Sequence, residues 1–232
     1  MKTPDISVGS FADRVMYFNE YLAKGCDVPD GVTVLNPYVD KEIMEINRTF
    51  YARHYNDDQP RVLVFGINPG RFGGGVTGVS FTDPYQLDTA AGIPNPFDKK
   101  KELSSTFIYM AINAFGGVDR FYRHFFLSAV CPLGFTSEGK NINYYDCKDL
   151  QTAVGPFILD TMRQQVHFSG RDVCVCIGGG ENLKYLEGLN AKHRFFSRII
   201  PLPHPRFVMQ YRRKKLDVYL DEYKAALESV IL

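Results

Sequence analysis

The stretch VLVFGINPGRFGGGVTGVSF, from Val62 to Phe81, constrains the fold of this chain most strongly. It begins as an uninterrupted apolar run, which is typical of a strand in a parallel sheet covered by helices on both faces. It then breaks into a loop with six glycines, and glycine lets a backbone approach another group closely. The stretch therefore predicts a strand over 61–67 that leads into a loop holding a ligand against its backbone.

Strand and helix patterns alternate along the rest of the chain after residue 60, which is typical of a three-layer α/β/α sandwich around a mainly parallel sheet of about four strands. Two helices precede this alternation, one capped by Ser10 and running to about residue 23, the other over 40–54. We expect one domain over 1–232, with 1–55 as a helical N-terminal extension packed on it. Further strands are predicted over 125–130, 172–177 and 197–202, and further helices over 104–115, 149–167, 180–189 and 209–229.

Composition excludes several classes of protein. The 27 basic and 26 acidic residues give a net charge of +1, so any nucleic-acid contact must come from local clusters. Five cysteines without a CxxC pair argue against a disulfide framework, and no Cys/His spacing resembles a metal site. No apolar run is long enough to span a membrane, and residues 1–10 lack a signal-peptide core. We expect a cytoplasmic, reduced, soluble protein without a metal or a membrane contact.

Three unusual segments follow predicted strands, where open α/β sheets bind their ligands. They are the loop after residue 67, the segment VCPLGFTSEGKNIN over 130–143, and the segment PHPRF over 203–207. The first lacks the Lys-Ser/Thr of a phosphate-binding loop, and its glycines do not fit GxGxxG. A purely structural glycine loop, or a loop that holds a flat ligand, remains open on these residues alone.

The same three segments resemble the active-site motifs of a known family. GINPGRFGGGVTGVSF, CPLGFTSEGKN and PLPHPRF are similar to motifs of the single-strand-selective monofunctional uracil-DNA glycosylases, within the uracil-DNA glycosylase superfamily. The similarity runs from about residue 60 to 215. The final motif is shortened, because His-Pro-Ser-Pro-Arg of the family is His-Pro-Arg here. The resemblance implies the fold predicted above and an enzyme that cuts a base from DNA.

The resemblance also implies roles for individual residues. Asn68 would position the attacking water, and His204 would donate a hydrogen bond to the departing base. Phe81 would stack on the flipped base and Asn141 would read its edge, with Asn143 as the alternative if the register shifts by two. A small residue at position 70 would leave space beside the base. The structural alternatives are core packing for Phe81, a turn for Asn141, and for His204 a purely structural side chain whose hydrogen bonds are satisfied. The implied base contacts are Gly66, Ile67, Pro69, Gly70, Phe72, Phe81 and Asn141.

DNA contact requires cations near the mouth of this site. The sequence QYRRKK places four of them at the start of the last predicted helix, where the helix dipole disfavours positive charge. They are therefore predicted to face phosphates, although a solvated turn is the alternative. The segment 98–102 is a weaker candidate because acids flank its lysines. The predicted DNA contacts are Arg206 and Phe207, which would enter the space left by the flipped base, and Arg212, Arg213, Lys214 and Lys215.

The sequence thus predicts a monofunctional DNA glycosylase that hydrolyses the N-glycosidic bond of uracil or a related damaged base in base excision repair. The base must be flipped out of the DNA, because its sugar carbon is inaccessible in a stacked duplex. No cofactor and no obligate protein partner are implied, and with Lys140 as the sole lysine in the motifs a lyase step is not expected. A nucleic-acid binding protein and a hydrolase of free nucleosides or nucleotides are the alternatives. We expect Asn68, Phe81, Asn141 and His204 to line one pocket.

Overall fold

A four-stranded parallel sheet forms the centre of the computed structural model, which describes residues 9–231. Its strands follow the order β3-β2-β6-β7, and every neighbouring pair runs parallel. The fully buried strand β2, whose apolar run the sequence showed, lies inside the sheet. The strand prediction is confirmed to within a residue or two at each end. The strands are β2 Val62–Gly66, β3 Phe125–Ala129, β6 Val173–Ile177 and β7 Arg198–Leu202.

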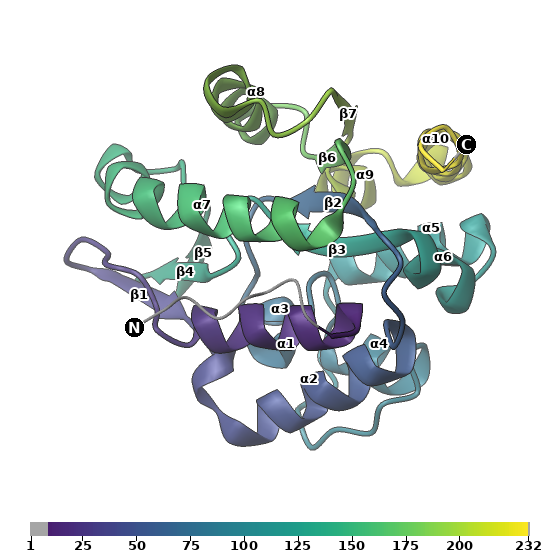
Figure 1. Ribbon diagram of the computed structural model, residues 1–232, viewed down its shortest axis with the longest axis horizontal. Helices are drawn as coiled ribbons and strands as arrows, with labels where there is room; N and C mark the ends of the chain where they lie inside the picture. Colours follow the sequence, from purple (N-terminus) through teal and green to yellow (C-terminus); the bar gives the residue numbers. More distant parts are fainter. Residues whose placement is uncertain (1–8, 232) are drawn as a thin grey trace.

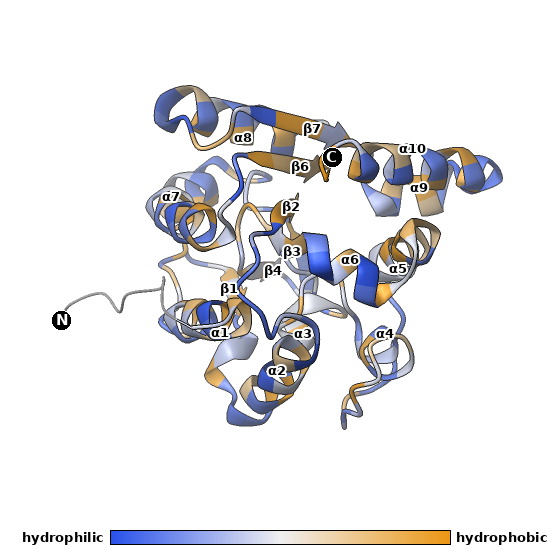
Figure 2. Cartoon of the chain, turned by 45° about the vertical axis from the view of Figure 1, so that its right-hand side comes forward, coloured by the Kyte–Doolittle hydropathy of each residue, from blue (hydrophilic) through white to orange (hydrophobic). Residues whose placement is uncertain are grey.

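Helices cover both faces of this sheet, so the three-layer prediction is confirmed. Figure 2 shows α7 and α8 on one side of the strands and α5, α9 and α10 on the other. α6 connects α5 to β3, and all three predicted crossover helices are present. The helices are α5 Leu103–Phe115, α6 Val118–His124, α7 Lys148–Ser169, α8 Glu181–His193, α9 Pro205–Tyr211 and α10 Leu216–Glu228.

The two predicted N-terminal helices are present as α1, Phe11–Leu22, and α2, Lys41–His54. Ser10 caps α1 as expected, because its hydroxyl oxygen accepts a hydrogen bond from the backbone N–H of Asp13 at 3.2 Å. α1 packs against α2 and α7, below the sheet in the view of Figure 1. The N-terminal segment is therefore a packed part of the molecule that also reaches the first glycine-rich loop, through the short helix α3, Gly74–Thr77.

A second, antiparallel sheet was not predicted. It has the order β1-β4-β5, with β1 Val32–Leu35, β4 Gly134–Ser137 and β5 Lys140–Ile142. The segment 130–143, which the sequence predicted as a loop, therefore contains a β-hairpin. Its two turn residues, Glu138 and Gly139, have φ values of 50° and 70°, as a tight hairpin turn requires. The partner strand β1 lies about a hundred residues away in the sequence, so local pattern could not reveal the pairing.

The last helix was predicted over 209–229 as one element, and this was wrong. The structure begins helix α9 at Pro205, turns through a 3-10 segment at Arg213–Lys215, and begins α10 at Leu216. The side chain of His204 caps α9, and a proline suits the first helical position. Four consecutive cations repel one another, which favours a break at this point. The short helices α3 and α4, Pro84–Thr89, and the 3-10 turn Pro37–Val39 were also not predicted.

The described part of the chain holds neither a helix long and apolar enough to cross a membrane nor a group of three or more side chains placed to bind a metal ion. Cys174 and Cys176 lie buried in β6, as predicted, and all five cysteines are free. Residues 1–8, on which the signal-peptide argument depends, lie outside the described residues.

Candidate active site

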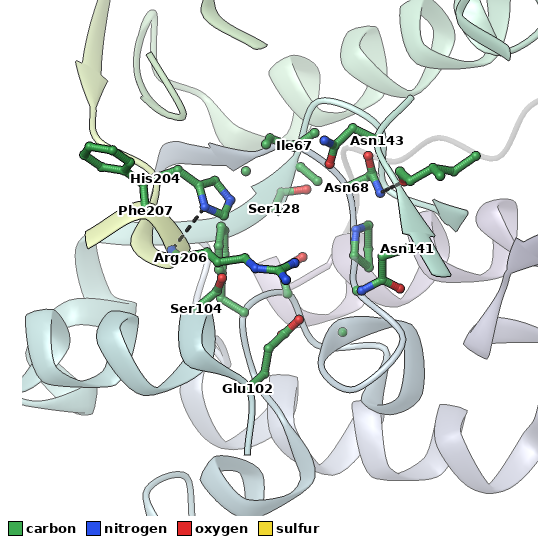
Figure 3. Close-up of a pocket in the computed structure, with 18 of the residues that line it drawn as sticks. Ile67, Asn68, Glu102, Ser104, Ser128, Asn141, Asn143, His204, Arg206 and Phe207 are labelled. Atoms are coloured by element: carbon green, nitrogen blue, oxygen red, sulfur yellow. Dashed lines mark hydrogen bonds between the residues drawn. The ribbon is translucent and has the colours of Figure 1, made fainter. Parts of the chain in front are cut away.

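One cavity of about 390 Å³ opens at the carboxyl ends of β2, β3 and β7. Asn68, Phe81, Asn141 and His204 all line it, so the prediction that these residues share one pocket is confirmed. They come from three segments that are far apart in the sequence, and Figure 3 shows the polar members converging on the same space. The other lining residues are Gly66, Ile67, Pro69, Gly70, Gly74, Ser80, Glu102, Ser104, Ser128, Ala129, Ile142, Asn143, Tyr145, Arg206, Phe207, Gln210 and Tyr211.

Phe81 forms one wall of the cavity by lying directly on Gly66, the last residue of β2. A Cβ added to Gly66 would stand 2.5 Å from Cζ of the Phe81 ring, so no side chain fits between them. Phe81 itself has a φ of 55°, a left-handed conformation that is strained for a bulky residue. The aromatic wall therefore depends on two unusual backbone positions at once.

A network of threonine hydroxyls holds Phe81 in this conformation. The Thr77 hydroxyl donates to the Thr82 carbonyl at 2.7 Å and accepts from the Val79 N–H at 3.1 Å. The Thr82 N–H in turn donates to the Val79 carbonyl at 3.1 Å. Thr77 and Thr82 are fully buried, so these bonds are protected from water and close the turn on which the ring is carried.

The N-terminal helices support this turn from behind. The Asn47 amide of α2 donates to the Thr77 carbonyl at 2.7 Å and accepts from the Asn19 amide of α1 at 3.1 Å. The Tyr38 hydroxyl donates to the Gly78 carbonyl at 3.1 Å. Gly78 has a φ of 72°, and a Cβ there would collide with the Asn47 amide. A buried polar chain thus connects the N-terminal segment to the wall of the cavity.

Asn68 is fixed by the hairpin segment on the opposite side of the loop. Its Nδ2 donates to the Ile142 carbonyl at 3.2 Å, and its Oδ1 accepts from the Tyr144 N–H at 3.0 Å. An amide has two donor hydrogens and two acceptor lone pairs, so one of each remains for a water or a ligand. These bonds also define which end of the amide is oxygen.

Asn141 and Asn143 both line the cavity, so the structure does not choose between the two residues for reading the base edge. The Asn141 Oδ1 accepts from the Arg71 N–H at 3.1 Å, and its Nδ2 lies beside Gly70. Asn143 uses its Nδ2 to bond Asp146 at 3.2 Å, which leaves its Oδ1 without a hydrogen-bond partner among residues 9–231. Asn141 thus presents mainly a donor and Asn143 mainly an acceptor.

His204 is a hydrogen-bond donor in its neutral form. Its Nδ1 accepts from the Arg206 N–H at 3.2 Å, which caps helix α9. The proton of the neutral ring therefore resides on Nε2. Burial, together with the neighbouring Arg206 charge, lowers the pKa of His204 to about 4, because both disfavour the cation. The ring packs beside Gly178, where a Cβ would stand 3.7 Å from its Cδ2.

Glu102 is a cavity residue that sequence reasoning missed. It precedes helix α5, and its backbone N–H donates to the buried Asp83 carboxylate at 2.7 Å. Figure 3 shows its carboxyl group directed into the cavity. Burial, and secondarily the Asp83 charge, raises the pKa of Glu102 to about 7, while Arg206 opposes this shift. Nothing in the run KKKELSS distinguishes this acid from a surface residue.

The Glu102 carboxyl group also corrects the expectation of open space beside Gly70. A Cβ on Gly70 or Gly73 would collide with the two carboxyl oxygens. These glycines are needed because the carboxyl group occupies the space that a side chain would take. A ligand beside Gly70 therefore contacts the Glu102 carboxyl group rather than open space.

The structure places the remaining predicted residues in three locations. Arg206 and Phe207 line the cavity from the first turn of α9. Phe72 lies outside it, 39% exposed, in an adjoining hollow. The cations 212–215 follow α9 and are exposed, and none of them lines the cavity. The lining residues Ser104, Ser128, Tyr145, Gln210 and Tyr211 were not predicted, because only the folded chain brings them together.

Comparison with known proteins agrees with this geometry. A sequence model of the uracil DNA glycosylase superfamily matches residues 52–228. The solved structure of wild-type SMUG2 from Pedobacter heparinus is similar to this chain with a TM-score of 0.91 and 45% sequence identity. The match covers 95% of this chain and 98% of that one. No curated protein matches the chain.

Thr77→Val should destabilise the protein although it keeps the shape of the side chain. The exchange leaves the Val79 N–H and the Thr82 carbonyl without their partner in a buried site, and such losses cost about 1–3 kcal/mol. Urea unfolding followed by circular dichroism would measure the free energy of unfolding. Thr152→Val, an exposed threonine on α7, is the control and should change it little. Equal effects of the two exchanges would contradict the role given to the Thr77 hydroxyl.

Glu102→Gln should stabilise the protein increasingly as pH rises. The pKa of Glu102 is higher in the folded protein than in the unfolded chain, so the protonated acid is favoured on folding. Its contribution to the free energy of unfolding is lost as pH rises from about 4.5 through about 7. The amide does not titrate, so the variant should gain about 3 kcal/mol over the wild type above pH 7 and little below pH 4.5. Unfolding measured between pH 4.5 and 8 tests this, and a difference that is independent of pH would refute it.

Proposed function

Because the chain belongs to the uracil DNA glycosylase superfamily, we propose that its cavity receives a flipped-out uracil and that His204 and Asn68 catalyse hydrolysis of the N-glycosidic bond. The protein is a DNA N-glycosylase that acts on uracil in base excision repair. The proposed catalytic roles of His204 and Asn68 rest mainly on one observation. A neutral histidine with its proton on Nε2 shares one cavity with a fixed asparagine and an aromatic wall.

The Phe81 ring provides the surface on which the base stacks. Aromatic stacking contributes about 1–3 kcal/mol per base and tolerates different bases. The ring is held by buried hydrogen bonds rather than by the ligand, so little of this stabilisation is lost to ordering when a base enters. Asn141 and Asn143 supply a donor and an acceptor for the polar edge of the base.

His204 acts on the departing base. As the bond to the sugar breaks, negative charge develops on the base and its carbonyl oxygens. A preorganised Nε2–H stabilises that charge without moving a proton, and one such donor contributes about 10²–10³ in rate. A cationic histidine would bind more tightly to the charge, but burial and Arg206 keep the ring neutral.

Asn68 acts on the water. Its free Oδ1 lone pair can accept a hydrogen bond from a water molecule, while its bonds to Ile142 and Tyr144 fix the direction of that lone pair. An amide is too weak a base to remove a proton before attack. This arrangement therefore suits a path in which the glycosidic bond breaks largely before the water attacks, and it supports a monofunctional enzyme without a covalent intermediate.

DNA meets the protein along helix α9 and the basic segment after it. Phe207 and Tyr211 are exposed on this helix at 42% and 68%, with their ring centres 5.9 Å apart. Such aromatic residues beside a base pocket suit entry into the space that a flipped base leaves. Arg212–Lys215 contact phosphates in this proposal.

Five free cysteines support a reducing compartment such as the cytoplasm.

The substrate range is tested with purified protein and single- and double-stranded oligonucleotides that carry uracil, 5-hydroxymethyluracil, xanthine or hypoxanthine. Alkali cleaves the abasic sites that result. Removal of uracil is expected, and removal of further bases would extend the range. Tight binding without removal of any base would favour a binding protein instead, and cleavage of free deoxyuridine with DNA untouched would favour a nucleoside hydrolase.

His204→Ala and Asn68→Ala should each lower the single-turnover rate on uracil-containing DNA by about 10²-fold or more. Affinity for the same oligonucleotide should change far less, because phosphate contacts and Phe81 stacking remain. Rapid-quench kinetics and fluorescence anisotropy measure the two quantities separately. If His204→Ala keeps the wild-type rate, His204 is not the donor.

The rate should not respond to protonation of His204 between pH 5 and 8. The donor is the neutral ring, and its low pKa keeps it neutral throughout this range. Because Glu102 titrates near pH 7, the pH profile is best measured in the Glu102→Gln variant. A fall in single-turnover rate with a midpoint near 6.5, the ordinary histidine value, would show that His204 is not held neutral.

A further inference from the structure

A second hollow of about 470 Å³ adjoins the base cavity and has no role in the proposed chemistry. The two spaces share walls, so a strand that leaves the base cavity on this side enters the hollow directly. The shared residues are Glu102, Ser104, Asn141, Arg206 and Gln210. The residues that belong to the hollow alone are Arg71, Phe72, Lys101, Leu103 and Lys140.

The cations of this hollow form no ion pair, although the Glu102 carboxyl group lines the same space. Within residues 9–231, Arg71, Lys101, Lys140 and Arg206 form no ion pair. The neighbouring lysines at positions 99 and 100 differ, because they pair with Asp88 at 3.0 Å and Asp98 at 3.1 Å. Four positive charges without an ion-pair partner, against the single acid Glu102, favour a polyanion at this concave surface.

An exposed aromatic ring lies beside these charges. Phe72 is 39% exposed, with the Arg71 guanidinium 4.6 Å and the Lys100 ammonium 5.6 Å from its ring centre. Cations that alternate with an exposed aromatic ring characterise grooves for single-stranded nucleic acid, in which phosphates meet the charges and bases stack on the rings. The combination distinguishes this hollow from a site for a small inorganic anion.

We propose that the hollow binds the nucleotide that flanks the flipped base, with its phosphate held by Lys140, Lys101 and Arg206 and its base stacked on Phe72. This inference rests on the proposed function, because it requires DNA in the base cavity. It gives Phe72 a role different from the one predicted from sequence, since the ring meets the neighbouring base rather than the excised one. It also gives Lys101, from the segment 98–102, a part in binding.

Glu102 supplies a second consequence of the same placement. Its carboxyl group lies on the wall common to both spaces, where a phosphate would add negative charge to that of Asp83. The cations that face it are Arg206, Lys101, Lys140 and Arg71. A phosphate bound here would oppose ionisation of Glu102 further, in the same direction as burial and Asp83, because a nearby like charge favours the neutral acid.

The phosphate contact is tested by combining protein variants with modified DNA. Single-stranded oligonucleotides carry a non-cleavable 2′-fluoro-deoxyuridine, and one methylphosphonate replaces a charged phosphate immediately 5′ or 3′ to it. Affinity is measured for the wild type and for Lys140→Ala. We expect one of the two neutral linkages to weaken wild-type binding about tenfold and to have a clearly smaller effect in the variant, in which Lys101 and Arg206 remain.

Lys192→Ala is the matched control, because this exposed lysine lies at the far end of α8. It should show the full effect of the methylphosphonate. Lys140 is exposed on a hairpin strand, so its loss should not affect folding. The hollow does not hold the flanking phosphate if neither linkage weakens wild-type binding. The same conclusion follows if the linkages weaken binding as much in Lys140→Ala as in the wild type.

Stacking on Phe72 is tested in the same way. Phe72→Leu is combined with an oligonucleotide in which the flanking base on the same side is absent. The two changes should be strongly non-additive, and full additivity would overturn this half of the inference. Uracil removal from an unmodified oligonucleotide by the wild type is measured in parallel. If uracil is not removed, the proposed function is contradicted. If uracil is removed normally but the protein and DNA changes are additive, only the proposed role of the hollow is contradicted.

Discussion

The contact between the Phe81 ring and the bare Cα of Gly66 is the interaction on which the site depends. It brings an aromatic surface to the end of a central buried strand, and it requires a glycine on one side and a left-handed phenylalanine on the other. The strain at Phe81 persists because Thr77, Asn47 and the N-terminal helices fix the turn that carries it. Residues far from the cavity therefore contribute to its shape.

Electrostatics divides the site into two environments. The inner part disfavours charge on its ionisable groups, because burial lowers the pKa of His204 and raises that of Glu102. A neutral donor and a dry aromatic wall suit a base that acquires charge only as it departs. The outer part carries uncompensated cations in the adjoining hollow and after α9, and these suit the permanent charge of a DNA backbone. Arg206 belongs to both environments, since it lies beside His204 and Glu102 and also lines the hollow.

The sequence predicted those features that local pattern determines. The apolar run of β2, the Gly139 turn and the proline after His204 each carry their own structural signal. The pairing of β1 with β4 could not be predicted because these strands lie about a hundred residues apart. Glu102 was missed for a related reason, since only the fold gives this residue its burial. The break after α9 shows that a helical pattern does not reveal where a cap such as His204 starts a separate helix.

A crystal structure of the protein bound to an oligonucleotide with 2′-fluoro-deoxyuridine would show directly whether His204 and Phe81 contact the base. The measured quantities are the stacking of uracil on Phe81 and the distance from His204 Nε2 to the uracil oxygen next to the glycosidic nitrogen. The account predicts a flipped uracil parallel to the Phe81 ring, with that distance at about 2.7–3.2 Å. A uracil outside the cavity, or a His204 Nε2 that faces away from the base, would contradict it.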